Sequence, residues 1–117
     1  MDTRTKILSN DDARKLAGVT IVSGYFDPIT TAHAERLQGL KKDGQSMLVL
    51  IATPANAILP AEARANLIAG LKCVDHVTII GGAYPDGLTP QTQLETEDAS
   101  RLEQLIRHVQ SRQQAAQ

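Results

Sequence analysis

The feature that most constrains the fold is a continuous apolar run over residues 47–52, in which no polar residue alternates with the apolar ones. A strand with one face in water would show that alternation, so the run predicts a strand that is covered on both faces. Strands of this kind occur in parallel sheets enclosed between layers of helices. Two shorter runs, 19–22 and 76–80, are rich in β-branched residues and predict two more strands.

Helical patterns separate these runs. A cluster of capping and acidic residues at 9–12 predicts a short helix to about residue 16, which Gly18 ends. Periodic apolar residues predict helices from about residue 31 to 40, from 61 to 73 and from 98 to 112. Alternating strands and helices indicate a small Rossmann-like α/β unit of three layers (αβα) with a mostly parallel sheet. We expect one domain over residues 1–117.

Composition narrows the class of protein. Twelve Lys and Arg against 13 Asp and Glu give a net charge of −1, which does not favour nucleic acid or an anionic membrane as a partner. The single Cys73 cannot form an internal disulfide or a cysteine metal cluster, and its apolar neighbours predict a buried structural thiol. No metal site is predicted. The polar N-terminus and the short apolar runs predict a soluble, cytoplasmic chain.

The turn after the first predicted strand holds the residues most suited to chemistry. In an open α/β sheet the ligand lies beyond the carboxyl ends of the strands. Gly24 permits close approach of the backbone to a ligand, and Thr30 or Thr31 can cap the following helix. The free N–H groups of that helix start suit an anion, and His33 falls in the first turn, where it can reach a bound phosphate.

The segment 24–33, Gly-Tyr-Phe-Asp-Pro-Ile-Thr-Thr-Ala-His, resembles the G-x-F-D-x-x-[HT]-x-G-H signature of the nucleotidylyltransferase superfamily. Two later segments are similar to other patterns of that superfamily: 60–68 to its E-x-R helix, and 73–77 to the C-V-D-x-V entry to the third strand. The second pattern is typical of the heptose-phosphate adenylyltransferase branch; glycerol-phosphate cytidylyltransferase is a further relative. The resemblance covers about residues 6–82, and residues 83–117 diverge.

The resemblance implies transfer of AMP or CMP from ATP or CTP to a phosphorylated sugar or polyol, with release of pyrophosphate. It implies that His33 and Thr30 act on the nucleotide phosphates as catalytic residues, and that nucleotide is bound by residues of one short segment: Gly24, Tyr25, Phe26, Asp27, Thr30 and His33. Mg²⁺ would accompany the nucleotide. A homodimer is expected by analogy.

The chain departs from the family pattern in three ways. Ala32 replaces a glycine of the signature, and no Lys or Arg occurs between Lys42 and Arg64, where relatives place a phosphate-binding lysine. The Ser/Thr-rich loop that follows the third strand in relatives is also missing. An alternative interpretation is therefore a catalytically degenerate nucleotide-binding or assembly module of the same fold.

Several residues also have a purely structural interpretation. Arg64 is predicted to be an exposed helix arginine paired with Glu62 or another carboxylate. His76 is predicted to be structural and His108 solvated, and the 84–87 segment is interpreted as a turn. The apolar stripe of the last helix is predicted to be core, with an oligomer contact as the alternative: Leu102, Leu105, Ile106 and Val109.

Overall fold

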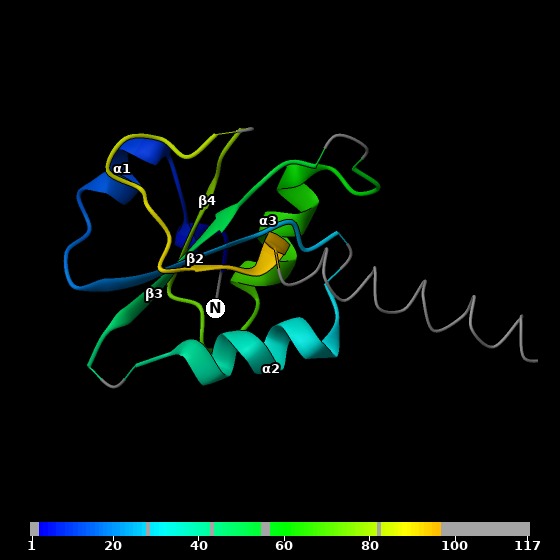
Figure 1. The fold of residues 1–117 in the computed structure, drawn as a ribbon, viewed down its shortest axis with the longest axis horizontal. Helices are drawn as coiled ribbons and strands as arrows, with labels where there is room; N and C mark the ends of the chain where they lie inside the picture. Colours follow the sequence, from blue (N-terminus) through cyan, green and yellow to red (C-terminus); the bar gives the residue numbers. More distant parts are fainter. Residues whose placement is uncertain (1–2, 28, 43, 55–56, 82, 97–117) are drawn as a thin grey trace, which may run out of the picture.

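The chain folds around a five-stranded, all-parallel sheet with the strand order β1-β4-β3-β2-β5 in a computed structural model (Figure 1). The structure describes residues 3–27, 29–42, 44–54, 57–81 and 83–96. The strands are β1 (Ile7–Leu8), β2 (Val19–Gly24), β3 (Ser46–Ile51), β4 (His76–Ile79) and β5 (Thr92–Gln93). The predicted α/β class with a parallel sheet is confirmed, and β1 and β5 are two short strands that the sequence did not reveal.

The helices lie on both faces of this sheet. A 3₁₀ turn (Thr3–Lys6) precedes β1, and the α-helices are α1 (Asn10–Arg14), α2 (Thr31–Leu40) and α3 (Ala61–Ala69). Residues from α2 and α3 pack with Val22, Val49 and Val77 in one core cluster. On the other face, Ala13 of α1 and Leu88 pack against Leu48 and Leu50. In Figure 1, α1 and the yellow 83–91 segment accordingly lie on the opposite side of the molecule from α2.

The helix ends agree with the local sequence, with one exception. The Ser9 side chain accepts the N–H of Asp12 and caps α1, and Gly18 adopts a φ of 65° in the turn that leads to β2. Helix α3 ends at Ala69, four residues earlier than the apolar periodicity predicts, because the chain turns at Gly70. The predicted helix 98–112, with its apolar stripe and His108, lies outside the described residues.

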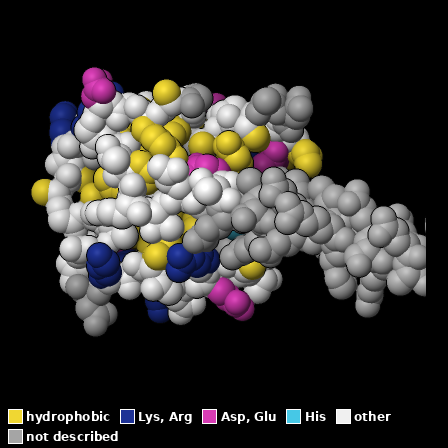
Figure 2. Space-filling model, viewed as in Figure 1, with side chains coloured by type: hydrophobic (Ala, Val, Ile, Leu, Met, Phe, Trp, Pro, Cys, Tyr) yellow, Lys and Arg dark blue, Asp and Glu magenta, His cyan; other side chains and the backbone are white. Residues whose placement is uncertain are grey.

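The α1 face of the sheet is only partly covered. Two β2 residues on this face, Val19 and Ile21, are half-buried, as is Leu16 after α1. A five-residue helix and an irregular segment cover less surface than α2 and α3 do on the other face. Figure 2 shows hydrophobic side chains at the surface over the region of α1 and the 81–91 segment. Counting only the described residues, this face of the sheet is therefore less covered than the α2–α3 face.

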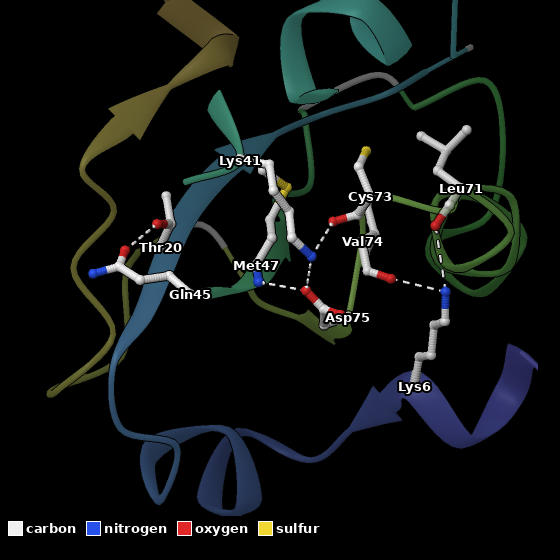
Figure 3. Close-up of polar contacts among 9 residues, drawn as sticks. All are labelled: Lys6, Thr20, Lys41, Gln45, Met47, Leu71, Cys73, Val74 and Asp75. Atoms are coloured by element: carbon white, nitrogen blue, oxygen red, sulfur yellow. Dashed lines mark hydrogen bonds and ion pairs between the residues drawn. The ribbon is translucent and has the colours of Figure 1, made fainter. Parts of the chain in front are cut away.

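Lysine side chains tie the helices to the amino edge of the sheet (Figure 3). Lys41, at the end of α2, pairs with Asp75 and donates to the Cys73 carbonyl at 3.2 Å. Asp75 also accepts the Met47 N–H at 2.8 Å, which joins the starts of β3 and β4. Lys6 donates to the carbonyls of Leu71 and Val74 after α3. These contacts give Lys6 and Lys41 structural roles at the edge opposite the predicted site.

Candidate functional site at the carboxyl edge of the sheet

The predicted site residues come together at the carboxyl end of β2, where the strand order reverses. From β2 the chain runs to β3 and then β4 on one side, and it returns from β4 to β5 on the other side of β2, so the strand order reverses at β2. Such a switch point is where ligands bind in open α/β sheets. The turn 25–30 leads from this point into α2, whose N-terminus lies at the same edge. The fold thus places the 24–33 segment where a Rossmann-like sheet holds its ligand.

Thr30 and His33 form a reciprocal cap at the start of α2. The Thr30 hydroxyl accepts the backbone N–H of His33 at 3.3 Å, and Nδ1 of His33 accepts the backbone N–H of Thr30 at 3.1 Å. Because Nδ1 accepts this hydrogen bond, the neutral tautomer that fits the cap carries its proton on Nε2. The imidazole is buried and therefore held in one orientation. A histidine takes the position that Glu or Gln fills in the usual capping box.

Phe26 supports this histidine from the preceding turn. Its ring is fully buried and meets the His33 ring edge-on, with centroids 5.3 Å apart. Its φ of 51° is unusual for a bulky residue, so the backbone is strained at this point. A Cβ on Gly24 would lie 2.7 Å from the Phe26 ring. Gly24 is therefore required by the packing of Phe26, a reason that the sequence did not reveal.

Asp27 binds the loop between β3 and α3. Its two carboxylate oxygens accept the backbone N–H groups of Ile58 at 2.6 Å and Leu59 at 2.7 Å. The hydrogen bond from Ile58 is the largest influence on the pKa of Asp27, and with Leu59 and Arg64 it outweighs desolvation, so the pKa lies below its ordinary value. Asp27, predicted to bind nucleotide, uses both oxygens to hold this loop.

Arg64 holds the same loop from within, and the prediction of an exposed arginine is wrong. Its side chain is 1% exposed. Nε donates to the Leu59 carbonyl at 3.1 Å, and Nη1 donates to the carbonyls of Tyr25 at 2.8 Å and Ala52 at 2.7 Å. A guanidinium can satisfy several fixed carbonyls at once, which explains why an arginine lies here. We call Asp27 and Arg64 together the loop clamp.

A second polar group lies beside the turn, on the α1 face of the sheet. The buried Ser23 hydroxyl donates to Oε1 of Glu95 at 2.5 Å, and the Tyr84 hydroxyl donates to the same oxygen at 3.0 Å. These residues come from β2, the 81–91 segment and the helical turn 94–96 after β5. The sequence interpretation treated Tyr84 only as part of a turn and did not single out Ser23 or Glu95. Only the pairing of β5 with β2 brings them together.

Among the described residues, few cationic side chains lie at this edge of the sheet. The guanidinium of Arg64 already donates to backbone carbonyls, and the other charged groups described here are the carboxylates of Asp27 and Glu95. Figure 2 shows the Lys and Arg side chains of the visible face mainly on its left side. Ala32, which replaces the signature glycine, is exposed in the first turn of α2. Residues 3–27, 29–42, 44–54, 57–81 and 83–96 contain no group of three metal-ligating side chains.

Comparison of the chain with protein-family models found no match, and a search of curated proteins found none either. Within the described part of the chain, none of the helices has the length and apolar character needed to cross a bilayer.

Proposed function

We propose that the chain binds nucleotide phosphates at the β2–α2 turn and acts as a nucleotidylyltransferase. The observation that carries the proposal is the Thr30–His33 cap, located at the switch point of the sheet and inside a segment that resembles the family signature. Backbone N–H groups of the first turn of α2 are donors of the kind that bind phosphate oxygens, and the resemblance implies that His33 contacts the same phosphates. ATP or CTP is the proposed nucleotide.

The proposed reaction is a displacement at the α-phosphorus of the nucleotide. A phosphate oxygen of a phosphorylated sugar or polyol forms the new bond to the α-phosphorus, and the bond from that phosphorus to the oxygen bridging to the β-phosphate breaks. Pyrophosphate leaves with the bonding electrons. His33 and Thr30 would stabilise the charge that develops on the phosphate oxygens, and the turn backbone from Gly24 to Asp27 would position the nucleotide. Mg²⁺ would supply neutralising charge on the phosphates.

A second candidate, a binding module without turnover, is favoured by the charge of the site. A triphosphate carries about four negative charges, and its attraction to the protein depends on fixed cations nearby. Arg64 donates to three carbonyls and is not exposed to a ligand. Both candidates predict nucleotide binding at the α2 N-terminus, and they differ in whether pyrophosphate is released.

The first experiment is calorimetry of the chain with Mg-ATP and then Mg-CTP. The matched variants are His33→Asn, whose side-chain oxygen can take the place of Nδ1 in the cap, and His33→Gln, whose amide reaches toward the Nε2 position. We expect His33→Asn to lose binding and His33→Gln to retain part of it. His76→Asn, at the amino end of β4, is the control and should bind as the wild type does.

A pyrophosphate-release assay with phosphorylated sugars and polyols then separates the two candidates. Release that depends on the acceptor supports the transferase, and binding without release supports the module. Equal nucleotide affinity in wild type and His33→Asn would refute both. We also propose a homodimer, for which light scattering should give twice the mass of the 12.6 kDa chain.

A further inference from the structure

An open groove lies between α2 and the turn that follows α3, toward the amino edge of the sheet. Its volume is about 600 Å³, which is in the range of pockets that hold small organic ligands. One wall comes from α2 and its C-cap and the other from residues 71–73; the lining residues are Ala34, Gln38, Lys41, Leu71, Lys72 and Cys73. Thr30 and His33 are not among them, so the groove is separate from the α2 cap.

Three of the six lining residues supply apolar surface. Leu71 and Cys73 are half-buried against the core, and Figure 3 shows their side chains pointing to the same side of the turn. Burial is the largest influence on the Cys73 thiol and raises its pKa, so the thiol is neutral at pH 7. Ala34 adds a half-buried methyl group from α2. Such walls suit a short hydrocarbon chain, because contact with them removes apolar surface from water.

The charged residues that line the groove are both lysines. The ammonium of Lys41 pairs with Asp75 and donates to the Cys73 carbonyl, so this ion pair compensates the nearby carboxylate (Figure 3). Lys72 and Gln38 are exposed, and within the described ranges neither side chain has a hydrogen-bond partner. One lies on each wall of the groove. An ammonium and an amide N–H are both donors to a carboxylate.

We propose that this groove binds a small carboxylate that carries a short hydrocarbon chain. The carboxylate accepts hydrogen bonds from the Lys72 ammonium and the Gln38 amide. The chain lies against Ala34, Leu71 and the Cys73 thiol. Charge selects an anion over an ammonium, because the lining cation without an ion pair is Lys72. The apolar walls select an organic over an inorganic anion. This site does not depend on the proposed nucleotide chemistry.

The test is a titration of the full chain, labelled with ¹⁵N, by sodium hexanoate at constant ionic strength. Hexylammonium chloride is the probe with the same chain and the opposite charge, and sodium acetate is the carboxylate without the chain. We expect saturable shifts of the 71–73 amides with hexanoate and affinities at least about fivefold weaker for the other two probes. Alkylation of Cys73, the one cysteine of the chain, by iodoacetamide should slow along the same saturation curve.

Two pairs of variants locate the site. Ala34→Leu places a larger side chain in the groove and should weaken hexanoate binding at least about tenfold. Ala63→Leu, half-exposed on α3 and outside the lining set, is the matched control and should leave the affinity unchanged. Lys72→Gln should weaken binding about fivefold, whereas Lys42→Gln, exposed and outside the lining set, should not.

The comparison of probes uses the wild-type chain, so it remains decisive if Ala34→Leu fails to fold. The proposal is overturned if hexanoate causes no saturable shift, if hexylammonium or acetate binds as tightly, or if hexanoate leaves the alkylation rate of Cys73 unchanged. It is also overturned if folded Ala34→Leu binds hexanoate as the wild type does. None of these measurements uses nucleotide, so their failure is distinct from failure of the proposed function.

Discussion

Replacement of Arg64 by methionine is the sharpest test of how the candidate site is held together. Methionine keeps much of the length of the side chain and removes the guanidinium that binds three carbonyls. Two of those carbonyls, of Tyr25 and Ala52, belong to the residues directly after β2 and β3, and the third belongs to the loop before α3. The change therefore removes a link between the β2–α2 turn and the loop without touching Thr30 or His33.

The expected loss follows from those three hydrogen bonds. At about 1.5–3 kcal/mol for each bond to a charged donor, their sum is roughly 5–9 kcal/mol. Loss of the guanidinium also removes its desolvation cost, which is several kcal/mol for an ion that is 1% exposed. The net destabilisation is therefore about 2–4 kcal/mol. With a urea dependence of about 2 kcal/mol per molar, the middle of the usual range for small proteins, the unfolding midpoint falls by roughly 1–2 M.

Urea unfolding followed by circular dichroism measures this change, with Glu62→Gln and Arg64→Lys as companions. An arginine paired with Glu62 on the helix surface would make the Glu62 and Arg64 variants equally mild. The buried clamp instead predicts that Glu62→Gln stays within about 0.5 kcal/mol of the wild type. The destabilisation by Arg64→Lys should be intermediate, because lysine keeps the positive charge and lacks the planar guanidinium that donates to several carbonyls at once. A destabilisation below about 0.5 kcal/mol for Arg64→Met would refute the reasoning.

Three further predictions concern the turn itself. The pKa of Asp27 in the folded chain lies below its ordinary 3.8. The contribution of this carboxylate to stability is therefore present above pH 3.8 and is lost as the pH falls through the pKa of the folded state. The unfolding midpoint of Asp27→Asn should vary less over this acid range than the midpoint of the wild type. Gly24→Ala should destabilise the fold by about 1–3 kcal/mol because its Cβ meets the Phe26 ring, which thermal unfolding will show. Thr30→Ala should cost about 1 kcal/mol in urea unfolding through loss of the cap, whereas Thr31→Ala should cost less; equal losses would contradict the cap.

The central elements could be predicted because their residues carry strong local patterns. The run around Leu48 and Leu50 is apolar on both faces. A parallel strand that is covered by helices on both sides buries all of these side chains. Strands β1 and β5 have two residues each, too few to show a period of two. Strand β5 exists because Thr92 and Gln93 pair with Val22 and Ser23. That pairing is a tertiary contact, which a window along the sequence does not contain.

The sequence indicated where the candidate site lies in the fold, but it indicated only some of the contacts that its residues make. Thr30 and His33 lie at a helix start, as their spacing predicts, because a cap and its third residue are local features. Arg64 was misplaced because its partners are backbone carbonyls, which leave no signature in side-chain identity. Glu95 and Ser23 are 72 positions apart, so their contact depends on strand order.

The loop clamp changes what a loss of nucleotide binding in this segment would mean. Asp27 lies in the resembled signature and spends both carboxylate oxygens on N–H groups of the loop, while Gly24 makes room for a buried ring. Substitutions at these positions change the shape of the turn directly, and any effect on ligand binding follows from that change. His33 is different, because an asparagine can preserve its cap and remove its Nε2. A direct phosphate contact is therefore established only when His33→Asn keeps the wild-type unfolding midpoint and still loses nucleotide; a parallel loss of both assigns His33 to the scaffold.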